Sequence, residues 1–183
     1  MRKLVVLWLA AVVGSLGVAA CDGPTDTPVA AGEILALQAD LVQFGMVSFL
    51  TASGIREGRV EADTAYAYND SAKVIIRGMH IVFFNDDGSE RASVTADGGE
   101  LEESTDRMLA QGNVVLIVYA DGRKIESSEL NYDPNRDRIW SDSATVQTLA
   151  NGDVTRGTAF ESDMEFKNVR IANPRGAIGN IIF

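Results

Sequence analysis

From Met46 to the C-terminus, short apolar runs alternate with polar turn signals. The runs are rich in the β-branched and aromatic residues that favour strands, and they occupy residues 74–84, 113–119, 138–149 and 160–171. Between them stand the residues that tight turns favour, at Asn69-Asp70-Ser71, Asn85-Asp86-Asp87-Gly88, Asp97-Gly98-Gly99, Asp121-Gly122, Asp133-Pro134-Asn135, Asn151-Gly152 and Asn173-Pro174. Short strands at this spacing predict an all-β sandwich, jelly roll or barrel.

The segment before Met46 departs from this pattern. Over residues 33–44, apolar side chains recur at an interval that suits a short helix, namely Ile34, Leu37, Leu41 and Phe44. A strand also fits the same positions, so both interpretations stay open.

Two of the runs, over residues 74–84 and 114–119, are apolar at both odd-numbered and even-numbered positions, that is, at both parities. A half-exposed strand alternates between apolar and polar positions because its successive side chains point to opposite faces. A strand that is apolar on both faces is buried twice, or it faces a core on one side and an apolar ligand on the other. A domain of this size has few buried layers, so we expect a sandwich whose interior admits an apolar ligand.

Strand parity then selects two candidate linings for that interior. The first set, with Phe160 near the mouth, comprises Ile76, Val82, Phe84, Val114, Leu116, Val118, Ile139 and Phe160. The opposite parity provides the alternative lining of Met79, Ile81, Phe83, Val115 and Ile117. The sequence does not decide between them.

A weak internal repeat of 34 residues runs through the same region. Ala62-Asp63 is followed by Gly78 and an apolar run, and Ala96-Asp97 is followed at the same interval by Gly112 and an apolar run. A third copy begins near Ser127. Glycine at equivalent strand positions indicates a bulge or a close backbone approach. Convergent hairpin chemistry is the alternative explanation.

The N-terminus has the pattern of a bacterial lipoprotein signal peptide. Arg2 and Lys3 precede the uncharged apolar residues 4–18, and Ala19-Ala20 stands directly before Cys21, the only cysteine. We therefore predict a signal peptide over residues 1–20, a lipidated Cys21 with a tether over residues 21–39, and a periplasmic domain over residues 40–183. An uncleaved spanning helix is the alternative anchor.

Charge and composition narrow the function. Without Arg2 and Lys3 the chain has 14 basic and 26 acidic residues, a net charge of −12, which argues against nucleic acid as a partner. The single histidine, His80, and single cysteine cannot supply a multi-histidine or multi-cysteine metal site, and neither a nucleophile elbow nor a phosphate-binding glycine loop occurs. We expect no catalytic residues, metal or cofactor, although a glycan hydrolase using paired carboxylates such as Glu100 and Asp142 stays an alternative.

Several short motifs, taken together in their order and spacing, carry a family resemblance. They are residues 54–63 (GIREGRVEAD), Ala67-Tyr68-Asn69-Asp70, Val74-x-x-x-Gly78, Phe83-Phe84-x-x-x-Gly88, Ala110-x-Gly112-Asn113-Val114, Leu130-Asn131-Tyr132-Asp133, Ile139-Trp140-Ser141-Asp142 and Gly157-x-x-Phe160-Glu161-Ser162-Asp163. In this respect residues 40–179 resemble the LptC family, the periplasmic component C of the lipopolysaccharide export machinery.

The resemblance implies an open antiparallel β-jelly roll. Such a protein receives lipopolysaccharide from an inner-membrane ABC transporter and passes it to a related periplasmic bridge protein, with the acyl chains held between the sheets. It also implies no enzymatic activity. A homologous domain would extend the groove by pairing with a sheet edge, and residues 175–183 form a candidate docking strand. A non-catalytic lipoprotein that scaffolds an envelope complex is the alternative function.

One feature departs from the family pattern, in which an N-terminal spanning helix forms the anchor. Here the anchor resembles a lipidated cysteine, and Asp22 after Cys21 resembles an inner-membrane retention signal. We therefore expect attachment at the periplasmic face of the inner membrane, with the inner leaflet of the outer membrane as the alternative.

Overall fold

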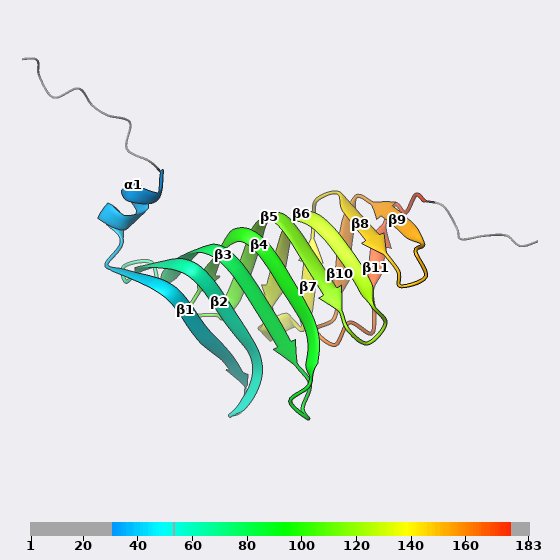
Figure 1. Cartoon of the computed structure of the whole chain (residues 1–183), viewed down its shortest axis with the longest axis horizontal. Coiled ribbons are helices and arrows are strands. Elements are labelled where there is room, and N and C mark those ends of the chain that lie inside the picture. Colours follow the sequence, from blue (N-terminus) through cyan, green and yellow to red (C-terminus); the bar gives the residue numbers. More distant parts are fainter. Residues whose placement is uncertain (1–30, 53, 177–183) are drawn as a thin grey trace, which may run out of the picture. The chain divides into compact units, whose positions relative to one another are not determined.

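A computed structural model describes residues 31–52 and 54–176. These residues contain one short α-helix, one 3-10 turn and eleven strands (Figure 1): α1(Ala31–Gln38), β1(Leu41–Ala52), β2(Ile55–Tyr68), β3(Lys73–Phe84), β4(Glu90–Glu102), β5(Arg107–Val118), β6(Arg123–Asp133), η1(Pro134–Arg136), β7(Arg138–Ser141), β8(Thr145–Thr148), β9(Val154–Gly157), β10(Ala159–Ser162) and β11(Arg170–Ala172). Both interpretations of residues 33–44 hold in part, because the helix ends at Gln38 and a strand begins at Leu41. Within the described ranges, no helix is long and apolar enough to cross a membrane.

All strand pairs are antiparallel and belong to one sheet. The main path runs β1-β2-β3-β4-β5-β6-β7-β10-β11, and β8 joins the sheet on β6 and carries β9. Within the described residues β1 pairs with β2 alone, and β11 pairs with β10. The sheet therefore has free edges, and the predicted all-β, open antiparallel jelly roll is confirmed.

Strands β2 to β6 bend along a single line that crosses the sheet. One row of inward side chains pairs across the strands in register: Val60, Ile81, Val94, Leu116 and Ile125. A second row pairs in the same way: Ala65, Ile76, Gly99, Ala110 and Leu130. The rows are five residues apart on four of the strands, an odd separation that would put them on opposite faces of a regular strand. Their side chains nevertheless belong to one core, so the pleat reverses between the rows.

The reversal divides the sheet into two leaves, whose strands arch over from one to the other (Figure 1). Leaf A contains residues 46–52, 55–62, 79–84, 90–96, 114–118 and 123–127 with β8 and β9. Leaf B contains residues 41–44, 64–68, 73–77, 98–102, 107–111 and 129–133 with β7, β10 and β11. We call the boundary between them the fold line.

The fold line explains one incorrect prediction. The turn signal Asp97-Gly98-Gly99 lies inside β4 and is not a turn. A Cβ atom on Gly98 would lie 2.5 Å from the Ile76 carbonyl oxygen, and one on Gly99 would overlap the Leu109 carbonyl oxygen. The glycines are there because neighbouring strands approach closely at the bend, whereas the composition of the segment is that of a turn.

Three of the strand predictions were also inaccurate. Residues 138–149 contain β7 and β8, and residues 160–171 begin within β10 and end within β11. In each case the chain crosses between leaves or turns back, so one apolar run supplies two strands. The strand predicted over residues 113–119 begins at Arg107, because Gly112 and Asn113 form a bulge and not a strand end: both have positive φ, and β5 holds one more residue there than its neighbours.

The internal repeat has a physical basis at the fold line. Gly78 approaches the carboxylate of Asp63 in the first copy, and Gly112 approaches that of Asp97 in the second. Both glycines have positive φ, +62° and +77°, which is unfavourable for residues with a Cβ atom. In the second copy the Asn113 side-chain amide also donates to Asp97 at 2.8 Å.

We expect Gly78→Ala to lower the free energy of unfolding by about 2 kcal/mol, because alanine is strained at positive φ and its Cβ atom would lie 3.0 Å from the Asp63 Cβ atom. Gly88→Ala is the matched control: φ is +83° there, but nothing lies within 4 Å of an added Cβ atom. Urea unfolding would be measured for both variants and for the double variant Gly78→Ala with Asp63→Ala. The comparison separates the backbone strain at positive φ from the overlap of the new Cβ atom with Asp63. Equal losses in the two single variants would show that the close approach to Asp63 has no energetic effect.

Candidate functional site

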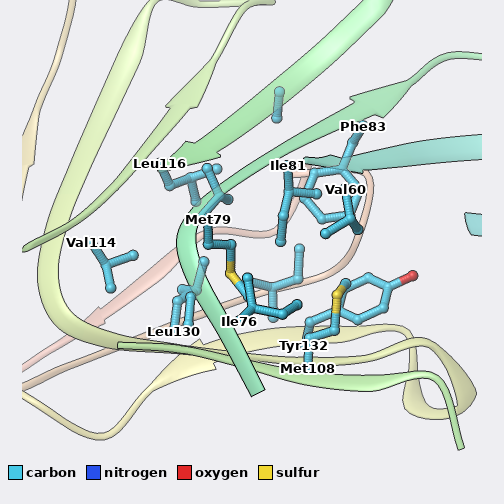
Figure 2. Packing of buried hydrophobic residues seen from close by; sticks show 14 of the residues in the cluster. Val60, Ile76, Met79, Ile81, Phe83, Met108, Val114, Leu116, Leu130 and Tyr132 are labelled. Atoms are coloured by element: carbon cyan, nitrogen blue, oxygen red, sulfur yellow. The ribbon is translucent and has the colours of Figure 1, made fainter. Parts of the chain in front are cut away.

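The space between the leaves is the main candidate site. Figure 2 shows side chains of the two inward rows pointing toward one another, with Val60, Ile81 and Leu116 opposite Ile76 and Leu130. The buried apolar cluster extends through both leaves, and its members are at most 8% exposed. The leaves are joined along the fold line, and their hairpin ends form an open mouth on the opposite side.

The structure brings residues of both candidate linings into this one interior. From the first set, the cluster contains Ile76, Val114, Leu116, Val118, Ile139 and Phe160. From the alternative set, it contains Met79, Ile81 and Phe83. Both sets contribute because parity reverses along β3, between Ile76 and Met79, where Gly78 stands at the fold line.

The other candidates lie elsewhere. Val82 is buried but outside the cluster, between Arg59 and Ser93 in the register. Phe84 is half-buried and lines a cleft at the mouth. From the alternative set, Val115 and Ile117 lie on the outer face of β5, where Ile117 is 36% exposed.

Two adjoining cavities open at the β1 end of the interior. The larger, of about 540 Å³, lies between the hairpin ends of the two leaves, and its apolar lining includes Phe49, Leu50, Ile55, Phe84, Tyr132 and Met164. The smaller, of about 240 Å³, is lined by Leu41, Met46, Val47, Ala65, Ala67, Val74 and Leu101 among others. Ser48 and Leu101 line both cavities. The larger volume falls in the range of small-molecule sites.

The contribution of β1 to these cavities was not predicted. Its residues were not among the four predicted apolar runs, although the strand interpretation of residues 33–44 covered its first positions. Arg56 lies at the same end, with its guanidinium carbon 3.8 Å from the centre of the Phe49 ring. The lining of the larger cavity is therefore mostly polar or charged, with apolar side chains between these groups.

Three aromatic side chains close the interior farther from β1. Phe83 of leaf A lies 5.5 Å from Tyr132 of leaf B, measured between ring centres, and 6.4 Å from Phe166. All three are buried. Burial, together with the carboxylates of Glu57 and Asp106, raises the pKa of Tyr132 to about 12. The leaves are thus in contact here, and the groove is open mainly toward β1.

Phe166 comes from the connection between β10 and β11, residues 163–169. The Asp163 carboxylate accepts hydrogen bonds from the backbone amides of Lys167 and Asn168 and from the Asn168 side chain. Burial alone would raise the pKa of Asp163, but these hydrogen bonds outweigh it and hold the pKa below its usual value. The connection is therefore an internally bonded unit.

Strand β1 exposes large apolar side chains along a free sheet edge. Leu41 is 59% exposed, Phe44 79%, Val47 53% and Phe49 43%, and Ile55 across the hairpin is 54% exposed. An exposed apolar edge strand of twelve residues is a ready site for pairing with another strand. Among the described residues, this edge is where exposed apolar side chains concentrate.

The polar candidates have other partners. Lys73 forms an ion pair with Glu100, Trp140 donates to Asp142 at 3.1 Å, and His80 lies 3.0 Å from the Glu61 carboxylate. The described part of the chain contains no group of three or more His, Cys, Asp or Glu side chains that could hold a metal ion. Cys21 and residues 177–183 of the candidate docking strand lie outside the described residues.

Two of the comparisons with known proteins produced matches. A family described as lipopolysaccharide-assembly, LptC-related, matches residues 5–175. The structure is similar to that of LptH from Pseudomonas aeruginosa, described as the LptA-homologous periplasmic component of the conserved lipopolysaccharide transport device, with a TM-score of 0.50 and 15% identity over 69% of this chain and 94% of that chain. At this identity the likeness shows the fold alone. The search of curated proteins produced no match.

Proposed function

Since the family match covers most of its length, this chain belongs to the LptC-related lipopolysaccharide-assembly family, and we propose that it accepts lipopolysaccharide from an inner-membrane ABC transporter and passes it to a periplasmic bridge protein of the same fold. Family membership and the open jelly roll support a role in periplasmic lipopolysaccharide transport. The role is non-catalytic, and the energy for transport comes from the ATP-hydrolysing partner.

The apolar interior between two leaves is the observation that carries this proposal. Each buried methylene group of an acyl chain contributes about 0.8 kcal/mol, so a carrier needs an apolar lining that continues from one protein to the next. The lining of the 240 Å³ cavity passes into the buried cluster through Met46, Ala65 and Val74, which belong to both. The acidic surface offers no broad electrostatic attraction for an anionic lipid, so the apolar part of the lipid supplies the affinity.

The two free edges give the groove a direction. The predicted anchor, Cys21, precedes the first residue of β1 by 20 positions, so a lipidated Cys21 at the periplasmic face of the inner membrane would keep the β1 end near the transporter. We assign the exposed β1 edge to the transporter side and the C-terminal edge, including residues 175–183, to the bridge protein. Edge pairing between jelly rolls would join their apolar interiors.

Photo-crosslinking tests the carrier function. With a photoreactive amino acid at Ile76 or Leu116, purified lipopolysaccharide is expected to form adducts, because both side chains point into the interior. The same probe at Val115 or Ile117, on the outer face of the same region, is the matched control and should yield at least tenfold less adduct. Absence of adducts from all four positions would contradict the carrier function and favour the scaffolding role.

A further inference from the structure

The segment Asp163–Val169 leaves leaf B after β10, contacts leaf A at the mouth of the groove, and returns to leaf B at β11. Its Glu165 carboxylate accepts a hydrogen bond from Arg91 of leaf A at 3.0 Å, and its Phe166 ring inserts beside Phe83 of the same leaf. Arg91 and Glu165 line both the 540 Å³ cavity and a separate cavity of about 410 Å³. The segment therefore stands between two open stretches of the mouth.

The segment is held mainly by its own leaf. The Met164 amide donates to Asp137 of leaf B at 3.1 Å, and Asp163 organises the remaining residues internally. Among the hydrogen bonds and ion pairs of the described residues, the Arg91–Glu165 pair alone joins the segment to leaf A. That ion pair is weak, because Glu165 is half exposed and solvent screens the attraction.

Phe166 has an unusual conformation for a residue that merely fills a core. Its φ is +57°, a left-handed backbone that disfavours a residue with a Cβ atom, yet its side chain is only 5% exposed. The ring packs edge-on against Phe83 and belongs to the apolar cluster that both leaves share. An acyl chain that bound in the same apolar space would compete with the Phe166 ring for contact with Phe83.

We propose that Asp163–Val169 is a displaceable clasp, and that in the empty protein Phe166 occupies the position that an acyl chain takes in the loaded protein. This inference rests on the proposed function. Opening the clasp requires loss of one ion pair and of the packing of Phe166 on Phe83. Without that packing, the hydrogen bonds within the segment open more often. Loading would then extend the open groove from the β1 end toward β11.

A reversible lock tests the clasp. The full chain would carry Cys21→Ser together with Arg91→Cys and Glu165→Cys. Oxidation or a short bis-maleimide would join the two new cysteines across the clasp. Uptake of purified lipopolysaccharide would be measured by adducts from a photoreactive probe at Leu116. We expect the disulfide-locked protein to lose at least tenfold in adduct yield, and reduction of that disulfide to restore it. Because the reduced protein is its own control, recovery shows that the substitutions leave the fold intact.

Hydrogen exchange supplies a second readout on the unmodified chain. Saturation with lipopolysaccharide should speed exchange of the Phe166, Lys167 and Asn168 amides at least tenfold, while the neighbouring rim segment Pro134–Arg136 stays unchanged. Adducts at Leu116 that persist in the locked protein, with unchanged exchange in residues 163–169, would overturn the clasp and leave the carrier function standing. Failure to form adducts in either redox state would overturn the carrier function and the clasp with it.

Discussion

Phe160→Ala is expected to lower the free energy of unfolding by about 3–5 kcal/mol, the usual range for deleting a buried aromatic side chain. Phe160 lies on β10, pairs with Ser141 of β7 and Ile171 of β11, and is 1% exposed within the apolar cluster. A loss of this size is a large part of the ~5–15 kcal/mol by which natural domains are stable. Urea unfolding followed by circular dichroism measures it.

Phe44→Ala makes the same chemical change at an exposed position and is the control for this prediction. Phe44 is 79% exposed on β1, so its replacement should alter the free energy of unfolding by no more than about 0.5 kcal/mol. Similar losses in the two variants would mean that the two leaves do not pack around Phe160 as described.

Combining Phe44→Lys with Val47→Lys should abolish docking at the β1 edge, weakening binding of the purified inner-membrane transporter complex at least tenfold. Both side chains are more than half exposed on that edge, so folding should tolerate the change. Lysine on an edge strand opposes pairing with another strand, because the pairing would desolvate its charge, and the substitutions also remove apolar contact area. Binding of the detergent-solubilised complex to the immobilised full chain measures the effect.

A matched pair of lysines, at Ile117 on the outer face of β5 and at Tyr119 directly after that strand, separates edge pairing from a general effect of charge. Ile117→Lys with Tyr119→Lys also introduces two cations at exposed apolar positions, but away from the free edge. This variant should bind the transporter as the unaltered protein does. If this variant loses binding and the β1 variant keeps it, docking takes place on the sheet face and not at its edge.

The sequence predicted much of the fold because its signals are local. Alternation of apolar runs with Asn-Gly, Asp-Gly and Asp-Pro turns indicates strands and hairpins whatever lies beside them, and the hairpins at residues 85–88 and 121–122 follow those signals. Gly78 and Gly112 marked special backbone positions, and both have positive φ in the structure. Within β5, Val114, Leu116 and Val118 were grouped on one face, and all three lie in the interior.

The lining of the groove could not be read from parity along β3. Ile76 and Ile81 face the same interior across an odd number of positions, because the pleat reverses at the fold line. The sequence of β3 alone does not indicate that the neighbouring strands reverse their pleat at the same level. Asp97-Gly98-Gly99 misled for the same reason, since the residues that permit a sharp bend within a strand are also those that form turns.

The sequence by itself determined a strand-rich chain with hairpins at defined places, glycines where the strands bend, and the motifs of its family. These properties depend on side-chain alternation and on backbone conformations that each residue permits. Only the tertiary structure decided which apolar face points inward, which edge is exposed, and that Phe166 closes the groove against Phe83. Those contacts join residues far apart in the chain, and they exist because the register of the folded sheet brings its two leaves together.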